Sequence, residues 1–382
     1  FRAGSGLPAR IPVIDLIEIG AGGGSLAGID ARGVVRVGPQ SAGADPGPAA
    51  YGLGGTRATL TDANLVLGYL GADAFLGGEM PLDLGAAERA LDKALCRPLS
   101  VERVRAAWGV HETINEDVAR AFRNHASERG FDYRRSAMVA FGGSGPIHAM
   151  RVANKLRVPQ VVFPGGAGVM SAIGMLASPL AFETLSSEAI PVETLTGATL
   201  DARFADLFRG AEDALHGAGI ARDALRRRRL LDMRYRGQGH EIEVVLPDWL
   251  SGDALAAKLP DLFAEAYAAT FSKAFIGRAI DIVAFKAEVE GPPPNVGKRL
   301  IPTTAQAPRA PHTRRAFVAA NMDFADVPVL ARTALRQGET VRGPALIEER
   351  ESTCVLGSGD EATIDAYGNL VATTAVALEA AA

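Results

Sequence analysis

The feature that most constrains the fold is a unit of apolar strand, glycine-rich turn and helix that occurs twice in succession within residues 137–177. The predicted elements are, in order, a strand over 137–141, a turn over 142–146 and a helix over 147–156, then a strand over 160–163, a turn over 164–168 and a helix over 169–177. Strands that alternate with helices in this way are typical of an α/β layer. Pro146 stands near the start of the first of these helices, a position that favours proline.

The pattern changes along the chain and predicts three regions. Residues 1–180 hold the α/β units, preceded by a hairpin over 26–37 and a long helix over 100–130. Residues 181–291 mix helix and strand patterns and predict a separate α+β domain. Residues 310–382 contain short strand-like runs with turns between them, which predict a small β-rich C-terminal domain.

Glycine is concentrated around one acid near the start of the chain. Residues 20–24 read Gly-Ala-Gly-Gly-Gly, and Asp45 lies within the glycine- and proline-rich residues 38–48. Glycine loses more backbone entropy on folding than any other residue, so such runs are expected where the backbone needs positive φ or approaches a ligand closely. We therefore interpret Gly22, Gly23, Gly24 and Ser25 as ligand-binding backbone. A mobile glycine loop is the alternative.

The second candidate ligand segment is the turn before the helix over 147–156. Exposed backbone amides at a helix start favour an anionic or polar group, which makes Gly142, Gly143, Ser144, Gly145 and His148 candidate binding residues. Ser144 is one residue short of the spacing of a serine-nucleophile turn, so we interpret it as a turn or hydrogen-bonding residue. A structural role for His148, in which it supports the binding residues without contacting the ligand, is the alternative.

Two acids stand in the most glycine-rich surroundings and are the candidate catalytic residues. A carboxylate at Asp45 or Asp62 can orient a magnesium-bound phosphate or a polar substrate. The alternative is structural, because aspartate commonly closes turns and caps helices. Asp62 precedes an apolar run in Thr61-Asp62-Ala63-Asn64, which is typical of a helix start. His111 and His125 lie on the apolar face of the long helix, and we interpret both as buried or rim residues with local hydrogen bonds.

Composition excludes several classes of function. The net charge of −4 offers no broad basic face for nucleic acid. Cys96 and Cys354 are far apart and lack metal-type spacing, which favours a reducing cytoplasm. No apolar run approaches the length of a membrane-spanning helix. Neither glycine segment matches a dinucleotide fingerprint or a phosphate loop ending in Lys-Ser or Lys-Thr.

The motifs together resemble the hydantoinase A subunit family, which includes ATP-dependent hydantoinases, 5-oxoprolinases and the acetone and acetophenone carboxylases. The resemblance covers nearly the whole chain. It rests on residues 14–25, 37–52, 61–65, 141–149, 233–238, 343–349 and 367–370.

This resemblance implies an actin- and Hsp70-like ATPase lobe in which residues 141–146 lie on the adenosine side, with Gly20 and Asp45 near the phosphates and substrate. ATP and Mg²⁺ are the implied cofactors, and a hydantoinase B type subunit is the implied partner. Family members carry Asp-Gly-Gly-Thr phosphate loops in an earlier lobe that is missing here, so the chain alone is expected to be half of an enzyme.

The implied reaction is phosphorylation of a lactam or imide carbonyl for ring opening. Carboxylation of a ketone is the alternative reaction, and a non-catalytic nucleotide- or partner-binding fragment is an alternative of another class. A sugar kinase relative fits less well, because the Ala-Asp-Pro-Gly-Pro segment at residues 44–48 belongs to the hydantoinase pattern.

Overall fold

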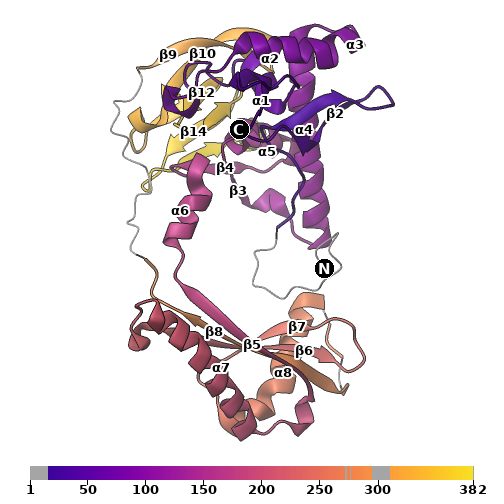
Figure 1. The fold of residues 1–382 in the computed structure, drawn as a ribbon, viewed down its shortest axis with the longest axis vertical. Coiled ribbons are helices and arrows are strands. Elements are labelled where there is room, and N and C mark those ends of the chain that lie inside the picture. The colour runs from indigo at the N-terminus through magenta and orange to yellow at the C-terminus, as the bar shows by residue number, and fades with distance from the viewer. Residues whose placement is uncertain (1–15, 272, 276, 295–309, 382) are drawn as a thin grey trace. The chain divides into compact units, whose positions relative to one another are not determined.

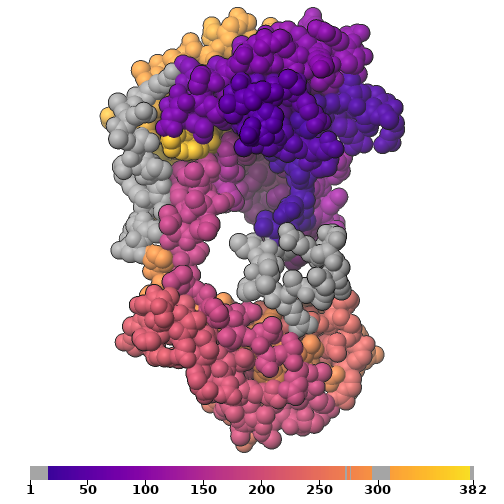
Figure 2. Space-filling model, in the orientation of Figure 1, coloured from indigo at the N-terminus to yellow at the C-terminus, as the bar shows by residue number. Residues whose placement is uncertain are grey.

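A computed structural model describes residues 16–271, 273–275, 277–294 and 310–381. The chain divides into two compact units, the first formed by residues 1–173 and 297–382 and the second by 174–296. Figure 2 shows indigo, purple, orange and yellow atoms packed together in the first unit, so segments from near both ends of the sequence build it. The backbone N–H of Phe317, for example, donates to the Leu67 carbonyl at 2.9 Å.

The described part of the first unit contains three sheets (Figure 1). One is an antiparallel hairpin, one has the order β13-β12-β10-β9, and one has the order β11-β14-β15-β4-β3. Their strands are β1 (Ser25–Ile29), β2 (Val35–Ser41), β3 (Ala137–Val139), β4 (Gln160–Phe163), β9 (His312–Val318), β10 (Asp323–Ala331), β11 (Thr340–Arg342), β12 (Ala345–Glu348), β13 (Thr353–Leu356), β14 (Glu361–Ile364) and β15 (Leu370–Thr373).

The helices of the first unit centre on the long helix α4 (Arg103–Glu128), which packs against α1 (Leu60–Val66) and α5 (Gly145–Leu156). The remaining α-helices of this part of the chain are α2 (Leu84–Leu91), α3 (Arg97–Leu99), α6 (Met170–Ala177), which runs across the boundary between the units, and α9 (Ala375–Ala381). The hairpin, the long helix and both strand–turn–helix units agree with the predictions from sequence.

The C-terminal strands do not form the separate domain that the sequence predicted. β15 pairs antiparallel with β4, with Leu370 opposite Phe163 and Thr373 opposite Gln160. The buried Arg332 side chain donates to the carbonyls of Phe163 and Gly368 and so joins the same two segments. A strand pattern gives no information about the pairing partner, and here the partner lies some two hundred residues earlier.

The strand before the first glycine turn also differs from the prediction. Its apolar run is typical of a buried strand, but β3 pairs only with β4 and is an edge of its sheet. Val139 and Phe141 are 56% and 49% exposed. An apolar edge of this kind leaves room for a ligand or a further segment beside the glycine turn.

The second unit is an antiparallel sheet of order β5-β8-β6-β7 with helices α7 and α8 packed against it. Its elements are β5 (Ala181–Pro191), α7 (Gly197–Gly217), β6 (Arg226–Tyr235), β7 (Ile242–Leu246), α8 (Gly252–Phe271) and β8 (Ile280–Glu290). Buried aromatic rings hold this core, with Tyr235 and Phe263 at 4.8 Å between centroids. The sequence did not predict β5, because polar and apolar residues do not alternate regularly along this edge strand, which is interrupted by a bulge between Ser187 and Ile190.

Candidate functional site

The two glycine segments, far apart in sequence, meet at the N-terminal ends of α1 and α5. The backbone N–H and the hydroxyl of Thr61 both donate to the Gly23 carbonyl, each at 2.9 Å. A Cβ atom on Gly23 would lie 2.8 Å from Thr61 Oγ1 and 3.8 Å from the Cβ of Ser144. Only glycine allows the chain to pass this close to Thr61. This close approach is to the protein itself, so ligand binding by the segment stays a prediction.

In the first glycine segment, one residue faces open space and the others hold the loop in its conformation. Gly22 faces open space, because a Cβ atom added there would have no other atom within 4 Å. Ser25 is buried and closes the turn, since its Oγ accepts from the Gly22 N–H at 2.9 Å. Gly24 packs against Ser41, whose Oγ would be 2.8 Å from an added Cβ. Of the four predicted binding residues in this segment, only Gly22 lines the cavity described below, and Gly23, Gly24 and Ser25 hold it in place.

The second segment presents the start of α5. Gly142 has a φ of +89° and donates its N–H to the Ala167 carbonyl at 2.8 Å, which turns the chain from β3 into the helix. Ser144 is the N-cap residue, but its side chain makes no capping hydrogen bond. The Gly145 amide at the start of α5 is therefore not capped by a side chain, whereas Pro146 has no N–H and the Ile147 N–H donates to the Ser144 carbonyl at 3.2 Å. Gly143 instead packs near the Glu351 carbonyl, 3.4 Å from an added Cβ.

A cavity of about 240 Å³ opens between these segments, and we name it the glycine-loop cavity. Backbone and small polar groups form one wall, from Ala21, Gly22, Ser144, Gly145 and His148. The other walls are apolar and come from Leu60, Ile114, Val118, Met138, Val139, Ala140, Phe141, Ala149 and Val152. This volume is below the roughly 300–1,000 Å³ of complete small-molecule sites, so the cavity is the size of part of a larger ligand.

Asp62 is a capping residue and does not reach the cavity, which corrects its assignment as a candidate catalytic acid. It is fully buried within α1, and the N-cap residue of this helix is Thr59. Its Oδ2 accepts from the N–H and hydroxyl of Thr59, both at 2.7 Å, and its Oδ1 accepts from the Ala50 N–H at 2.7 Å. Burial raises the pKa of this carboxyl, opposed by these hydrogen bonds. Asp62 thus ties the end of the proline-rich loop to α1.

Asp45 remains a candidate catalytic residue only because its side chain is exposed. It lies on the surface of the loop after β2 and makes no hydrogen bond or ion pair with the described residues. It does not line the glycine-loop cavity. Its catalytic role therefore stays a prediction.

His148 belongs to a buried hydrogen-bonded network. The donor and acceptor of each bond in it can be assigned by starting from Glu112. The Asn115 amide nitrogen donates to the Glu112 carboxylate at 3.4 Å, so the Asn115 oxygen faces His148 and accepts from its Nδ1 at 2.8 Å. His148 Nε2 must then accept, and it does so from the Asn64 amide nitrogen at 3.2 Å. The Asn64 oxygen accepts from His111 Nδ1 at 2.9 Å.

Both imidazoles of this network are neutral near pH 7. Burial lowers the pKa of His148 to about 4 and holds the pKa of His111 well below its usual range. Glu112 stays ionised, because hydrogen bonds from Arg151 and Lys155 lower its pKa despite the opposing effect of burial. The sequence interpretation of His111 as a buried, hydrogen-bonded residue is confirmed. His125 is half-buried at the other end of α4.

Sequence reasoning missed Asn64 and Asn115, which are buried with 1% and 0% exposure. A signal was present for Asn115, which follows His111 by four residues and so lies on the same face of α4. No such signal connected α1 to α4 and α5, because Asn64 meets both histidines through tertiary packing.

Among the described residues, no group of three histidine, cysteine, aspartate or glutamate side chains is placed to hold a metal ion. The helices in the described ranges also include none with the length and apolarity needed to cross a membrane.

Comparison with known proteins places this geometry in a family. Residues 2–184 match the hydantoinase/oxoprolinase model, and residues 191–372 match the hydantoinase/oxoprolinase C-terminal domain model. The chain belongs to the hydantoinase/oxoprolinase family, as its motifs indicated.

Named relatives include enzymes of two reaction types. The caprolactamase subunit alpha of Pseudomonas jessenii is 32% identical over 93% of this chain and 52% of its own length. The crystal structure of ATP-dependent caprolactamase from the same organism has a TM-score of 0.71 at 31% identity, over 93% of this chain and 52% of that one. A nucleotide-free structure of acetone carboxylase has a TM-score of 0.77 at 26% identity, over 92% of this chain and 51% of that one. The chain thus spans about half the length of these relatives.

Proposed function

We propose that this chain forms the adenosine-side part of an ATP-dependent enzyme that activates the carbonyl of a cyclic amide for ring opening. The observation that carries the proposal is the meeting of the two glycine segments around the glycine-loop cavity. The caprolactamase relative supports an amide substrate, since its name describes ATP-dependent action on a lactam. We further propose that residues 1–180 correspond to part of an actin-like ATPase lobe.

In this proposal the apolar walls of the cavity receive the adenosine, and the Gly145 amide at the start of α5 donates to one of its polar groups. A slot lined by Val139 and Phe141 with one polar wall suits a flat heterocycle with a hydrophilic substituent. Its small volume fits a site that is completed by residues beyond this chain.

Bound ATP, with Mg²⁺ to balance its charge, would supply the phosphoryl group that makes the amide oxygen a leaving group. Water then attacks the carbonyl carbon and the ring C–N bond opens, which leaves an acyl phosphate that a second water hydrolyses to the carboxylate and phosphate. The net change is ATP, lactam and two waters to ADP, phosphate and the amino acid. Asp45 is the candidate acid–base residue at the substrate end. We expect the reaction in the cytoplasm, since neither Cys96 nor Cys354 forms a disulfide.

Ketone carboxylation is the second candidate function, favoured by the similarity to acetone carboxylase. Both reactions begin by phosphorylating a carbonyl-derived oxygen, so the same nucleotide site serves either. Both would need the remaining half of the relatives' length and, we propose, a hydantoinase B type subunit.

The test is calorimetric titration of MgATP into the chain alone and into the chain combined with that remaining half and partner. We expect binding and phosphate release in the combined complex, with phosphate release increased by a lactam. Tight binding by the chain alone would instead favour a self-contained nucleotide module. No binding by any combination would refute the proposal, and stimulation by a ketone with bicarbonate but not by a lactam would favour the carboxylase.

A matched pair of variants locates the binding. Gly22→Glu places a carboxylate in the glycine-loop cavity without a steric clash, since no atom lies within 4 Å of its Cβ position. Gly28→Glu adds the same charge on β1, again with no atom within 4 Å, away from the cavity. We expect Gly22→Glu to abolish nucleotide binding and Gly28→Glu to preserve it. Equal binding by the two variants would remove the cavity from the nucleotide site.

A further inference from the structure

Two successive glutamates end the motif at residues 343–349, which carried part of the family resemblance but does not line the glycine-loop cavity. Glu348 is the last residue of β12, and Glu349 follows it directly. Successive side chains along a strand point to opposite faces, so the two glutamates meet different neighbours. They therefore form a natural pair in which the role of one can be compared with that of the other.

Glu348 faces the strands of its own sheet. Its Oε1 accepts from Arg314 Nη2 on β9 at 2.7 Å, and the two side chains are 13% and 15% exposed. In this sheet β12 and β9 lie on either side of β10, so the ion pair reaches across one strand. Within the described ranges, no hydrogen bond joins the Glu348 side chain to either turn around β4 and α5. Glu348 thus supports the sheet.

Glu349 faces the turn that follows β4. Its Oε2 accepts from the Ala167 N–H at 3.2 Å, and its Oε1 lies 3.6 Å from Arg332 Nε. The Arg332 side chain is only 4% exposed, and its Nη2 donates to the carbonyls of Phe163 and Gly368. A buried cation that is itself fixed by two backbone carbonyls therefore holds the Glu349 carboxylate against this turn.

Ala167 connects Glu349 to the second glycine segment. Its N–H donates to the Glu349 carboxylate, and its carbonyl accepts from the Gly142 N–H at 2.8 Å. Gly142 begins the turn that ends in Ser144 and Gly145, and these two residues line the glycine-loop cavity. Both backbone groups of Ala167 thus belong to one hydrogen-bonded line from the Glu349 carboxylate toward the wall of the cavity.

The loop that Glu349 begins also packs on both turns. The Glu349 N–H donates to the Ser352 carbonyl at 2.8 Å and closes the loop between β12 and β13. A Cβ atom added to Gly168 would overlap the side chain of Glu351, and one added to Gly143 would lie 3.4 Å from the Glu351 carbonyl oxygen. The loop therefore leaves the two turns little room to move past it.

We propose that Glu349 is a positioning residue for the glycine-loop cavity. Its carboxylate fixes the turn around Ala167, this turn fixes Gly142, and Gly142 fixes the start of α5. Glu349 itself does not line the cavity. The expected effect on nucleotide binding rests on the proposed function and deepens it, because it names a residue outside the cavity on which the nucleotide affinity depends.

The first test measures hydrogen–deuterium exchange by mass spectrometry on the full chain without nucleotide. Glu349→Met removes the acceptor of the Ala167 N–H with little change in side-chain length. We expect peptides that cover residues 139–145 and 164–169 to exchange about tenfold faster than in the parent. A general loss of stability would also speed exchange in α4, so the rates are compared with that helix.

Glu348→Met is the matched control. It breaks the ion pair with Arg314 by the same substitution one residue earlier, and we expect the exchange of both peptides relative to α4 to stay as in the parent. Glu349→Gln keeps an oxygen that can accept from the Ala167 N–H and is expected to exchange more slowly than Glu349→Met. Equal exchange of the two peptides in Glu349→Met and Glu348→Met would overturn the proposal.

A second pair of variants covers the case in which Glu349→Met does not fold because Arg332 is left without its partner. Arg332→Met with Glu349→Met replaces the buried ion pair by apolar side chains, a change that proteins often tolerate. Arg332→Met with Glu349→Gln restores only the acceptor for the Ala167 N–H. We expect slower exchange of both peptides in the second double variant, and equal exchange in the two would overturn the proposal.

The last test titrates MgATP into the combined complex. We expect about tenfold weaker binding with Glu349→Met and unchanged binding with Glu348→Met. Unchanged affinity in both variants would overturn the role of Glu349 at the nucleotide site. If the parent complex itself does not bind MgATP, the proposed function fails, whereas the exchange experiment still decides whether Glu349 positions the turn.

Discussion

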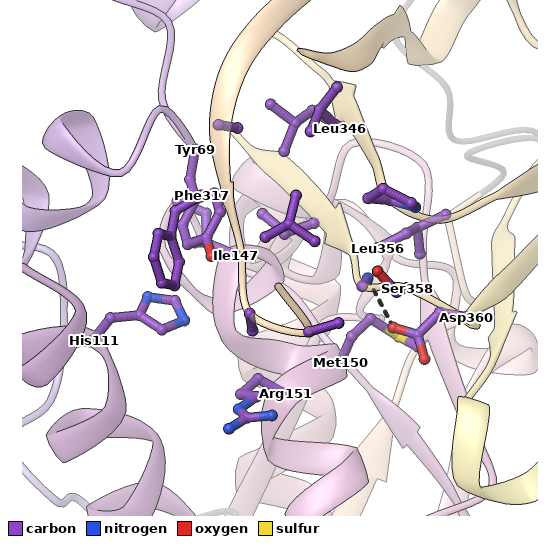
Figure 3. Close-up of a pocket in the computed structure, with 18 of the residues that line it drawn as sticks. Tyr69, His111, Ile147, Met150, Arg151, Phe317, Leu346, Leu356, Ser358 and Asp360 are labelled. Atoms are coloured by element: carbon purple, nitrogen blue, oxygen red, sulfur yellow. Dashed lines mark hydrogen bonds between the residues drawn. The ribbon is translucent and has the colours of Figure 1, made fainter. Parts of the chain in front are cut away.

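Two cavities on different faces of α5 are built in different ways. The glycine-loop cavity takes its polar wall largely from backbone at Gly22 and Gly145. The second cavity, of about 210 Å³ (Figure 3), takes its walls from side chains such as Trp108, His111 and Phe317. A backbone wall tolerates few side chains, because any addition either fills the space or separates the loops. A wall of side chains can change its specificity by substitution. The network from His111 through Asn64 to His148 joins the two cavities.

The largest expected effect is on stability, and it tests how far the fold around the glycine-loop cavity depends on the buried carboxylate of Asp62. Asp62→Ala removes the capping box of α1 and leaves the buried N–H groups of Ala50 and Thr59 without an acceptor. We expect a loss of about 3–5 kcal/mol in the free energy of unfolding, measured by urea denaturation. Asp83→Ala is the control, since Asp83 caps α2 from an exposed position and its loss should cost about 1 kcal/mol. Similar losses for both variants would contradict the structural role of Asp62.

The histidine network predicts a pH dependence of stability. The pKa of His148 is about 4 in the folded protein and about 6.5 when unfolded, so the unfolded state binds the proton first as the pH falls. The stabilisation from neutral His148 is present above about pH 6.5 and is lost between about pH 6.5 and 4, by up to about 3 kcal/mol.

His148→Gln isolates this contribution, because the other titrating groups are common to both proteins. Urea denaturation at pH 8 and pH 5 should show a smaller loss of stability on acidification for the variant than for the parent. An equal loss in both proteins would show that His148 is not held neutral by burial.

The smallest effect compares two neighbouring glycines. Gly23→Ala brings a Cβ within 2.8 Å of Thr61 Oγ1 and disrupts its hydrogen bond to the Gly23 carbonyl, so we expect a loss of about 1–2 kcal/mol. Gly22→Ala meets no atom within 4 Å and should change stability by less than about 0.5 kcal/mol. Thermal denaturation measures both. Thr61→Ala added to Gly23→Ala should recover part of the loss, and a failure to do so would place the strain elsewhere.

Much of the local structure could be predicted from the sequence because its signals are local. The period of apolar residues located α4, and glycine and proline located the turns around β4 and α5. The candidate site was predicted in part. The two glycine segments do meet, but only Gly22 among residues 22–25 lines the cavity. Asp62 was assigned the wrong role, because a capping aspartate and a catalytic aspartate have the same appearance in sequence.

The sequence by itself thus determined where most helices and turns and many of the strands lie, since hydrophobic period and turn chemistry act between residues a few positions apart. Only the tertiary structure decided which elements became neighbours. It paired β15 with β4, left β3 at a sheet edge and brought Asn64 between His111 and His148. These contacts depend on burying apolar surface and satisfying buried polar groups across long separations in the chain, which a local pattern does not encode.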